Sequence, residues 1–206
     1  MIVNNLETFS CLIYIHKNLT YYNIPKTLFI EMKGFGEKNQ TNKKKLQNKN
    51  NQIKFDQLIK QAFELQRQGN RIEAAKYYSY LIRTGLKDYR IYSNYGTFLK
   101  EEGKYKEAEI ELKKAITLNP GYANAYYNLA GIFIEKRNLQ QAEIFLRKAI
   151  KLKSNFAIAH YNLGFILKDL GRLQEAELYI HNALQINPHL SDAYFSLSTL
   201  KNTIKN

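Results

Sequence analysis

Residues 126–130 read Tyr126-Tyr127-Asn128-Leu129-Ala130, and the same stretch continues with Ala142, Leu146 and Ala149. A shift of the sequence by 34 residues brings matching residue types into register. The clearest matching positions are Ala74, Ala108, Ala142 and Ala176, together with Asn94, Asn128 and Asn162. Coincidence of this many positions at one period indicates an array of repeated structural units.

Each period contains two helical patterns. In residues 89–122 the first pattern comprises Tyr92, Tyr95, Gly96 and Leu99, which lie on one face of a helix. Gly103 interrupts it, a second pattern starts at Tyr105, and Pro120 ends that pattern because the residue before proline is disfavoured in helical conformation. We predict first helices over 56–68, 90–102, 124–136 and 158–170, and second helices over 72–83, 106–117, 140–151 and 174–185.

Small residues indicate how the two helices of each unit pack. The first helices place Ala62, Gly96, Ala130 and Gly164 where they face their own second helix, and a bulky residue there would hold the backbones apart. The turns between the helices contain Gly69, Gly103 and Gly171, which we expect to adopt a left-handed conformation. Arg137 occupies this position in the third unit, at a cost of about 1 kcal/mol if its φ is positive.

This pattern resembles the tetratricopeptide repeat (TPR) family. Four copies match, at 55–88, 89–122, 123–156 and 157–190, and residues 191–206 begin a fifth copy that stops after one helix. The resemblance implies an all-α fold, a right-handed superhelix of four helical hairpins with a C-terminal capping helix over 191–206. Because TPR arrays serve many unrelated complexes, the resemblance is specific for fold and not for function.

In the TPR family the first helices form a concave wall that binds extended peptides or partner helices. The resemblance therefore places Asn94, Asn128 and Asn162 in one column of that wall, continued by Ser196. A side-chain amide carries both a donor and an acceptor, so it can pair with a peptide backbone of any sequence. A similar asparagine ladder lines the repeat arm of O-linked N-acetylglucosamine transferases. The alternative is that the asparagines reflect the general bias of this sequence toward Lys, Asn and Ile.

The neighbouring column holds Tyr127, Tyr161 and Phe195. These rings either offer rigid contact area to a partner or fill the space between first helices, and the sequence favours neither. Arg90 and Lys168 also face inward, but acidic residues stand among such cations, so the groove is expected to be mixed in sign.

The chaperone-tail binders of the family use a two-carboxylate clamp of lysines, asparagines and an arginine. Ile59, Phe63 and Asn124 stand where a Lys, an Asn and a second Lys would be needed. We therefore predict that this chain does not recognise that kind of C-terminal tail.

Residues 1–54 differ in composition from the rest, with nine Lys and three Glu. Residues 1–31 form a poorly defined N-terminal extension whose apolar stretch, 9–15, is too short and lacks the flanks of a secretory signal. Translation that starts at Met32 is one hypothesis for this extension. Residues 32–54 are predicted to be a basic, disordered linker, which we prefer to a nucleic-acid or membrane-surface contact.

The sequence shows no enzyme signature. It contains no phosphate-binding glycine loop, no HExxH and no CxxC pair, Cys11 is the single cysteine, and His160 has no other histidine in its repeat position. We predict a non-enzymatic protein without a catalytic residue, metal or cofactor.

The expected function is a protein–protein interaction scaffold or adaptor that holds a protein or extended peptide in the concave groove. One alternative is a stand-alone or truncated substrate-binding arm of a glycosyltransferase, and another is nucleic-acid association through the basic tail, which we disfavour. The sequence contains no run of 18 apolar residues, so we expect no transmembrane helix. We expect a cytoplasmic protein, and the bias toward Lys, Asn and Ile suggests a bacterial source.

Overall fold

The computed structural model describes the backbone of residues 42–205 and the side chains of residues 52–203. Within that range the chain folds into nine helices and no strand. The helices are α3 (Asn42–Arg67), α4 (Arg71–Arg83), α5 (Tyr89–Glu101), α6 (Tyr105–Leu118), α7 (Ala123–Glu135), α8 (Leu139–Leu152), α9 (Ala157–Asp169), α10 (Leu173–Ile186) and α11 (Ser191–Lys205). The chain divides into two units, residues 1–56 and residues 57–206. The predictions for residues 1–31, including a start at Met32, lie outside the described residues.

The helix α3 corrects one expectation. It begins at Asn42, so residues 42–54 are helical, where the sequence had predicted a disordered linker. Residues 42–67 contain no Gly or Pro and are rich in Lys, Gln and Leu, which cost little backbone or side-chain entropy in a helix. A polar composition therefore excluded a buried core for this segment without excluding a helix.

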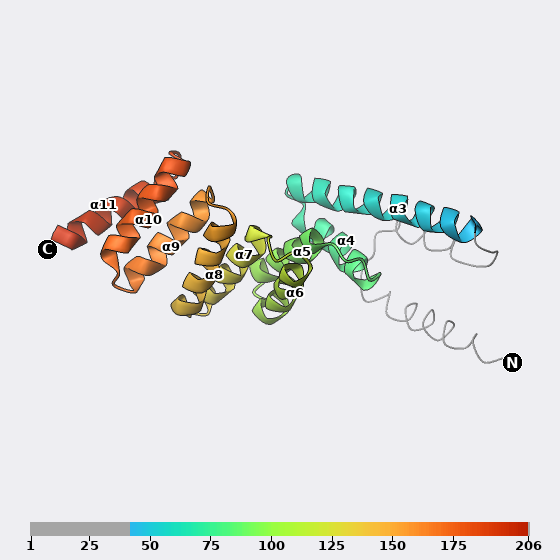
Figure 1. The fold of residues 1–206 in the computed structure, drawn as a ribbon, viewed down its shortest axis with the longest axis horizontal. Helices are drawn as coiled ribbons and strands as arrows, with labels where there is room; N and C mark the ends of the chain where they lie inside the picture. The colour runs from blue at the N-terminus through green and yellow to red at the C-terminus, as the bar shows by residue number, and fades with distance from the viewer. Residues whose placement is uncertain (1–41, 206) are drawn as a thin grey trace. The chain divides into compact units, whose positions relative to one another are not determined.

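Residues 57–206 form the predicted all-α helical-repeat superhelix (Figure 1). Each of α5, α7 and α9 packs against the helix that follows it, and α5 also contacts α7 as α9 contacts α11. Because each hairpin leaves apolar side chains uncovered, the next hairpin completes its core. One continuous cluster accordingly runs from Ala130 to Leu200, and α11 covers its end with Ala193, Leu197 and Leu200.

The small residues lie where the sequence predicted, between the two helices of a hairpin. A Cβ built on Gly164 would come 2.7 Å from Ile180 Cγ1 and 3.0 Å from the carbonyl oxygen of Ala176. A Cβ on Gly96 would come 2.8 Å from Leu112 Cγ. Ala130, at the same position of the third repeat, is fully buried. The absence or small size of these side chains thus sets how closely α5, α7 and α9 approach their partners.

The turns confirm the backbone prediction. Gly69, Gly103 and Gly171 all have φ between 73° and 78°, in the left-handed region. Arg137 takes their place in the third repeat with φ 57°, so this repeat carries the predicted strain of about 1 kcal/mol. Gly85, with φ 81°, follows α4 in the first repeat.

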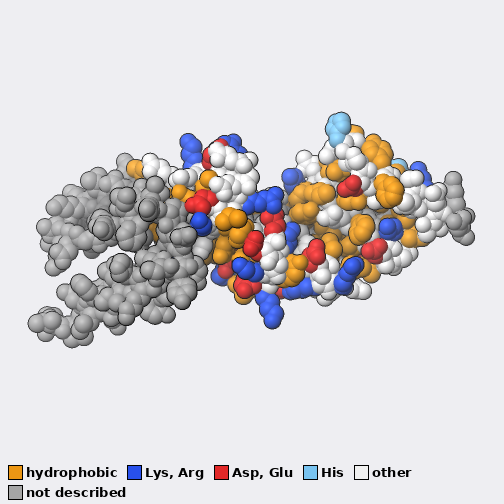
Figure 2. All heavy atoms as spheres, turned by 180° about the vertical axis from the view of Figure 1, so that it is seen from behind, with side chains coloured by type: hydrophobic (Ala, Val, Ile, Leu, Met, Phe, Trp, Pro, Cys, Tyr) orange, Lys and Arg blue, Asp and Glu red, His pale blue; other side chains and the backbone are white. Residues whose placement is uncertain are grey.

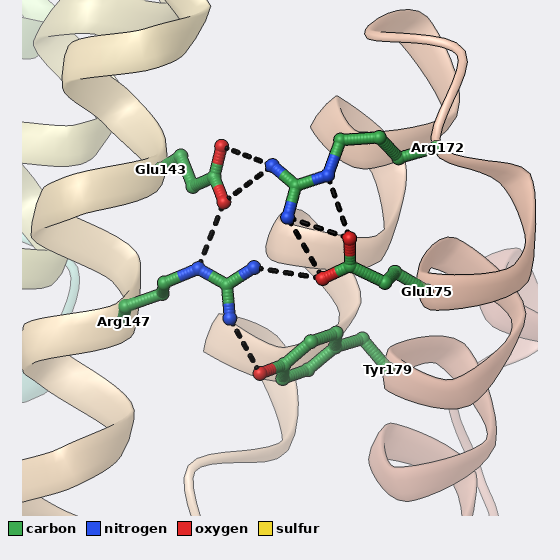
Figure 3. A network of polar contacts seen from close by, with 5 residues as sticks. All are labelled: Glu143, Arg147, Arg172, Glu175 and Tyr179. Carbon is green, nitrogen blue, oxygen red and sulfur yellow. Dashed lines mark hydrogen bonds and ion pairs between the residues drawn. The ribbon is translucent and has the colours of Figure 1, made fainter.

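Ion pairs join neighbouring repeats at each of the junctions between the four repeats. Arg71 pairs with Glu101 at 2.9 Å, and Lys136 pairs with Glu109 at 2.9 Å. The third and fourth repeats share the larger network drawn in Figure 3, which comprises Glu143 and Arg147 of α8, Arg172 just before α10, and Glu175 and Tyr179 of α10. These side chains are partly exposed, so each pair contributes little energy and mainly fixes geometry.

The network changes how Glu143 titrates. Burial pushes the pKa of this carboxyl upward, but the hydrogen bonds from Arg147 and Arg172 outweigh that effect and leave the pKa below its ordinary value of 4.5. A lowered carboxyl pKa means that the folded state holds the proton less tightly than the unfolded state does. The contribution to stability is therefore present above pH 4.5 and is lost as the pH falls below it.

None of the helices described has the length and apolarity that crossing a bilayer requires.

The close approach of α9 and α10 predicts that Gly164→Ala is destabilising. The added methyl must displace Ile180 or the backbone of α10, which typically costs about 1–3 kcal/mol and exceeds the gain in helix propensity of about 1 kcal/mol. The matched control is Gly131→Ala in α7, whose Cβ would meet only the side chain of Lys100, at 3.4 Å. Urea unfolding monitored by circular dichroism should show a lower midpoint for Gly164→Ala and an equal or higher midpoint for Gly131→Ala. Equal midpoints for wild type and Gly164→Ala would contradict this account of the packing.

The titration of Glu143 predicts a pH-dependent effect of Glu143→Gln. At pH 7 the variant should be less stable than wild type by a few tenths to about 1 kcal/mol, because Arg147 and Arg172 each lose one of their two charged partners and keep Glu175. The difference should shrink as the pH falls below the lowered pKa of Glu143, where the wild-type carboxyl takes up a proton. Urea midpoints across this range measure the effect. Glu135→Gln, which removes an exposed carboxylate that forms no ion pair in the described part of the chain, should show no such pH dependence.

Candidate partner-binding surface

The three predicted asparagines occupy equivalent places on α5, α7 and α9, and each bonds to a neighbouring repeat. The Nδ2 of Asn94 donates to the hydroxyl of Tyr78 at 3.3 Å. The Nδ2 of Asn128 donates to Thr97 Oγ1 at 2.8 Å, and that of Asn162 donates to the hydroxyl of Tyr127 at 3.3 Å. Each amide is therefore held in one orientation by a hydroxyl of the preceding repeat.

The Oδ1 atoms of the same asparagines remain available. In the described part of the chain these oxygens accept no hydrogen bond, and the buried polar side-chain atoms without a partner there are Glu111 Oε2 and His160 Nδ1. Since the three oxygens are not among those buried atoms, each is at least partly accessible while its nitrogen is engaged. A row of fixed acceptors, one per repeat, can receive donors from a bound chain.

The aromatic column has two buried hydroxyl contacts and one exposed end. The ring of Tyr127 lies 5.1 Å from that of Phe156, and burial raises the pKa of its hydroxyl despite the hydrogen bond from Asn162. The hydroxyl of Tyr161 lies 3.2 Å from Ser196 Oγ, and Ser196 itself is buried. Phe195, by contrast, is 73% exposed. The rings thus fill space between repeats at Tyr127 and Tyr161 and present contact area to solvent at Phe195.

The two predicted cations differ in their surroundings. Arg90 pairs with Asp88, which precedes α5, and its guanidinium lies 5.3 Å from the centre of the Phe63 ring. Burial alone would raise the pKa of Asp88, but the bonds from Arg90 leave it lowered. Lys168 Nζ lies 5.1 Å from the centre of the Phe165 ring. Acidic and basic side chains alternate on the face seen in Figure 2, with hydrophobic patches between them.

A pocket of about 180 Å³ lies between the first two repeats. Its polar lining residues are Gln66, Arg71, Tyr78, Asn94, Thr97 and Glu101. Of these, only Asn94 was expected from the sequence to be a site residue. A tyrosine at position 78, where later repeats have Leu112, Leu146 and Ile180, is the sequence signal that could have indicated a polar contact at this junction.

His160, on α9, takes the repeat position of Tyr92 and Tyr126. It is buried, and its Nε2 lies 2.9 Å from the carbonyl oxygen of Ser154. Among the residues that the structure describes, no group of three or more His, Cys, Asp or Glu is arranged to hold a metal ion.

The repeated hairpins and their small-residue contacts define a tetratricopeptide-repeat protein. Residues 58–186 match the sequence model of the Cilia and flagella-associated protein 70 middle TPR-like domain, and the chain belongs to this family. No curated protein matches the sequence.

Solved structures with the same fold include MamA from Desulfovibrio magneticus RS-1, at 19% identity and a TM-score of 0.63, with coverage of 74% of this chain and 86% of that chain. YrrB, described as a TPR protein with an unusual peptide-binding site, has 21% identity, a TM-score of 0.59 and coverage of 72% and 77%. The first TPR of Spaghetti (RPAP3), bound to the HSP90 peptide SRMEEVD, has 20% identity, a TM-score of 0.56 and coverage of 57% and 94%. At these identities the similarity shows the fold.

Proposed function

We propose that this chain is a non-enzymatic interaction scaffold or adaptor that binds an extended segment of a partner protein along α5, α7, α9 and α11. The observation that carries the proposal is the row of solvent-accessible Oδ1 atoms of Asn94, Asn128 and Asn162. Their nitrogens are bonded to Tyr78, Thr97 and Tyr127, which fixes where the oxygens point. Backbone N–H groups of an extended segment are suitable donors for a row of this kind.

The remaining predicted residues have supporting roles in the proposal. Phe195 offers an exposed ring at the C-terminal end, while Tyr127 and Tyr161 orient the ladder and contribute ring edges. Lys168 supplies a positive charge near Phe165. Arg90 contributes less, because its charge is already matched by Asp88.

Two of the solved structures with the same fold support this proposal by analogy. YrrB is described with a peptide-binding site and the RPAP3 domain with an HSP90 peptide. For this chain we keep the prediction from the sequence that it does not bind a chaperone C-terminal tail of this kind. Phe63, at one position that the clamp would need, packs its ring 6.0 Å from that of Tyr78. A cytoplasmic location and a bacterial source stay predictions from the sequence.

The ladder is tested by Asn128→Ala combined with Asn162→Ala in the full chain. Removing two acceptors should weaken binding by about tenfold, since each hydrogen bond contributes about 0.5–1.5 kcal/mol. The partner is first captured from the organism's lysate on immobilised wild-type chain and identified by mass spectrometry. Its affinity for each purified variant is then measured by biolayer interferometry, and helicity by circular dichroism.

Thr97→Val is the matched control. It breaks the same bond between repeats as Asn128→Ala but keeps the amide of Asn128 and the volume of the side chain. We expect a similar loss of stability and a smaller loss of affinity than in Asn128→Ala alone, because the acceptor is kept but is no longer held in one orientation. Unchanged affinity in the double variant, or a loss in Thr97→Val equal to that in Asn128→Ala alone, would show that the asparagines serve only to join the repeats.

A further inference from the structure

Tyr78 lines the polar pocket between the first two repeats. Tyr78 is 2% exposed, and its hydroxyl donates to Gln66 Oε1, with the carbonyl oxygen of Ala62 at 3.4 Å as a second acceptor, while it accepts from Asn94 Nδ2 at 3.3 Å. Burial raises the pKa of Tyr78 to about 12, although the bond from Asn94 lowers it. The hydroxyl is therefore protonated at any physiological pH, and both hydrogen bonds keep the same direction.

This arrangement leaves two complementary groups. Gln66 uses its oxygen toward Tyr78, so its Nε2 is a donor with no partner in the described part of the chain. Asn94 uses its nitrogen, so its Oδ1 is an acceptor with no partner there. Both residues line the pocket. The same hydroxyl contacts both amides, so the donor and the acceptor belong to side chains that meet at Tyr78.

The rest of the polar lining is electrically balanced. Arg71 and Glu101 form an ion pair at 2.9 Å and both line the pocket, so their charges offset each other. Thr97 Oγ1 already donates to the carbonyl oxygen of Ser93 and accepts from Asn128. Among the uncharged side chains of the lining, the groups left for a ligand are thus the Gln66 donor and the Asn94 acceptor.

We propose that this pocket is a specificity site for a side-chain carboxamide, an Asn or Gln of the bound partner segment. The inference rests on the proposed function, because it assumes that a segment lies along the first helices. The carboxamide N–H₂ would donate to Asn94 Oδ1, and its oxygen would accept from Gln66 Nε2. The pocket volume, about 180 Å³, far exceeds the ~10–15 Å³ that one water molecule needs.

Other side chains fit the pocket less well. A carboxylate could accept from Gln66 but offers no donor to Asn94, and an ammonium group could donate to Asn94 but offers no acceptor to Gln66. An aliphatic side chain offers neither a donor to Asn94 nor an acceptor to Gln66. Neither charge would find an unpaired counter-ion, because Arg71 and Glu101 are already paired.

A phage-displayed library of random linear peptides, selected on the full-length chain, tests the inference. Enriched peptides should share one Asn or Gln that is required for binding. Synthetic peptides with Leu or Glu at that position should bind about tenfold more weakly by fluorescence anisotropy, because one or both pocket amides lose their partner.

Gln66→Glu provides the converse test. This substitution keeps an acceptor for Tyr78 and replaces the free donor with a second acceptor, so the pocket should prefer a donor-only side chain. Affinity for the Asn or Gln peptide should fall about tenfold, and a version with Lys at that position should bind more tightly than it does to wild type. The control Gln61→Glu adds the same charge to an exposed position of α3 outside the pocket and should change neither affinity.

Three outcomes would overturn the inference. Enriched peptides that lose affinity in the Asn128→Ala, Asn162→Ala chain but tolerate Leu or Glu at every position would refute the pocket and leave the proposed function standing. Equal behaviour of Gln66→Glu and Gln61→Glu would likewise refute the pocket alone. If no peptide is enriched, the proposed function fails, and the carboxamide site fails with it.

Discussion

The close contact between the two helices of each hairpin is the constraint on which residues 57–206 depend. Gly96 and Gly164 have no room for a methyl group against the helix that follows, and the second helices meet them with Ala108 and Ala176, which are fully buried. This contact brings the backbones close enough for Leu112 and Ile180 to fill the remaining space. A hairpin of fixed thickness can then stack on the next one in a repeated way.

Stacking leaves polar groups between the repeats, and the chain satisfies them in two ways. Ion pairs such as Arg71–Glu101 and Glu109–Lys136 join the junctions at the surface, where water weakens them. The amides of Asn94, Asn128 and Asn162 join the junctions closer to the core, through hydroxyl groups that are partly or fully withdrawn from water. Both kinds of contact hold neighbouring repeats in a defined register.

The two polar atoms of each asparagine amide in the ladder therefore have different surroundings. One atom of each amide bonds across the junction, and in the proposed function the other would accept a bond from a partner, so one side chain would serve both structure and binding. The fold alone does not name that partner, because members of the TPR class with similar hairpins serve different complexes. What distinguishes this chain is the chemistry at each junction: a tyrosine hydroxyl between two amides at the first, a threonine at the second and a second tyrosine at the third.

The sequence by itself determined the hairpins, because helix periodicity, glycine turns and small packing positions are local properties repeated at a fixed spacing. The described helices from Arg71 onward begin and end within about one residue of their predicted bounds, and Arg137 adopts the positive φ that its position required. The helical form of residues 42–54 was missed because a polar composition excludes a core and says little about backbone conformation. Only the tertiary structure decided which hydroxyl each asparagine meets and that Gln66, Tyr78 and Asn94 share one pocket. These residues come from different helices, and the packing of whole hairpins sets the distances between them.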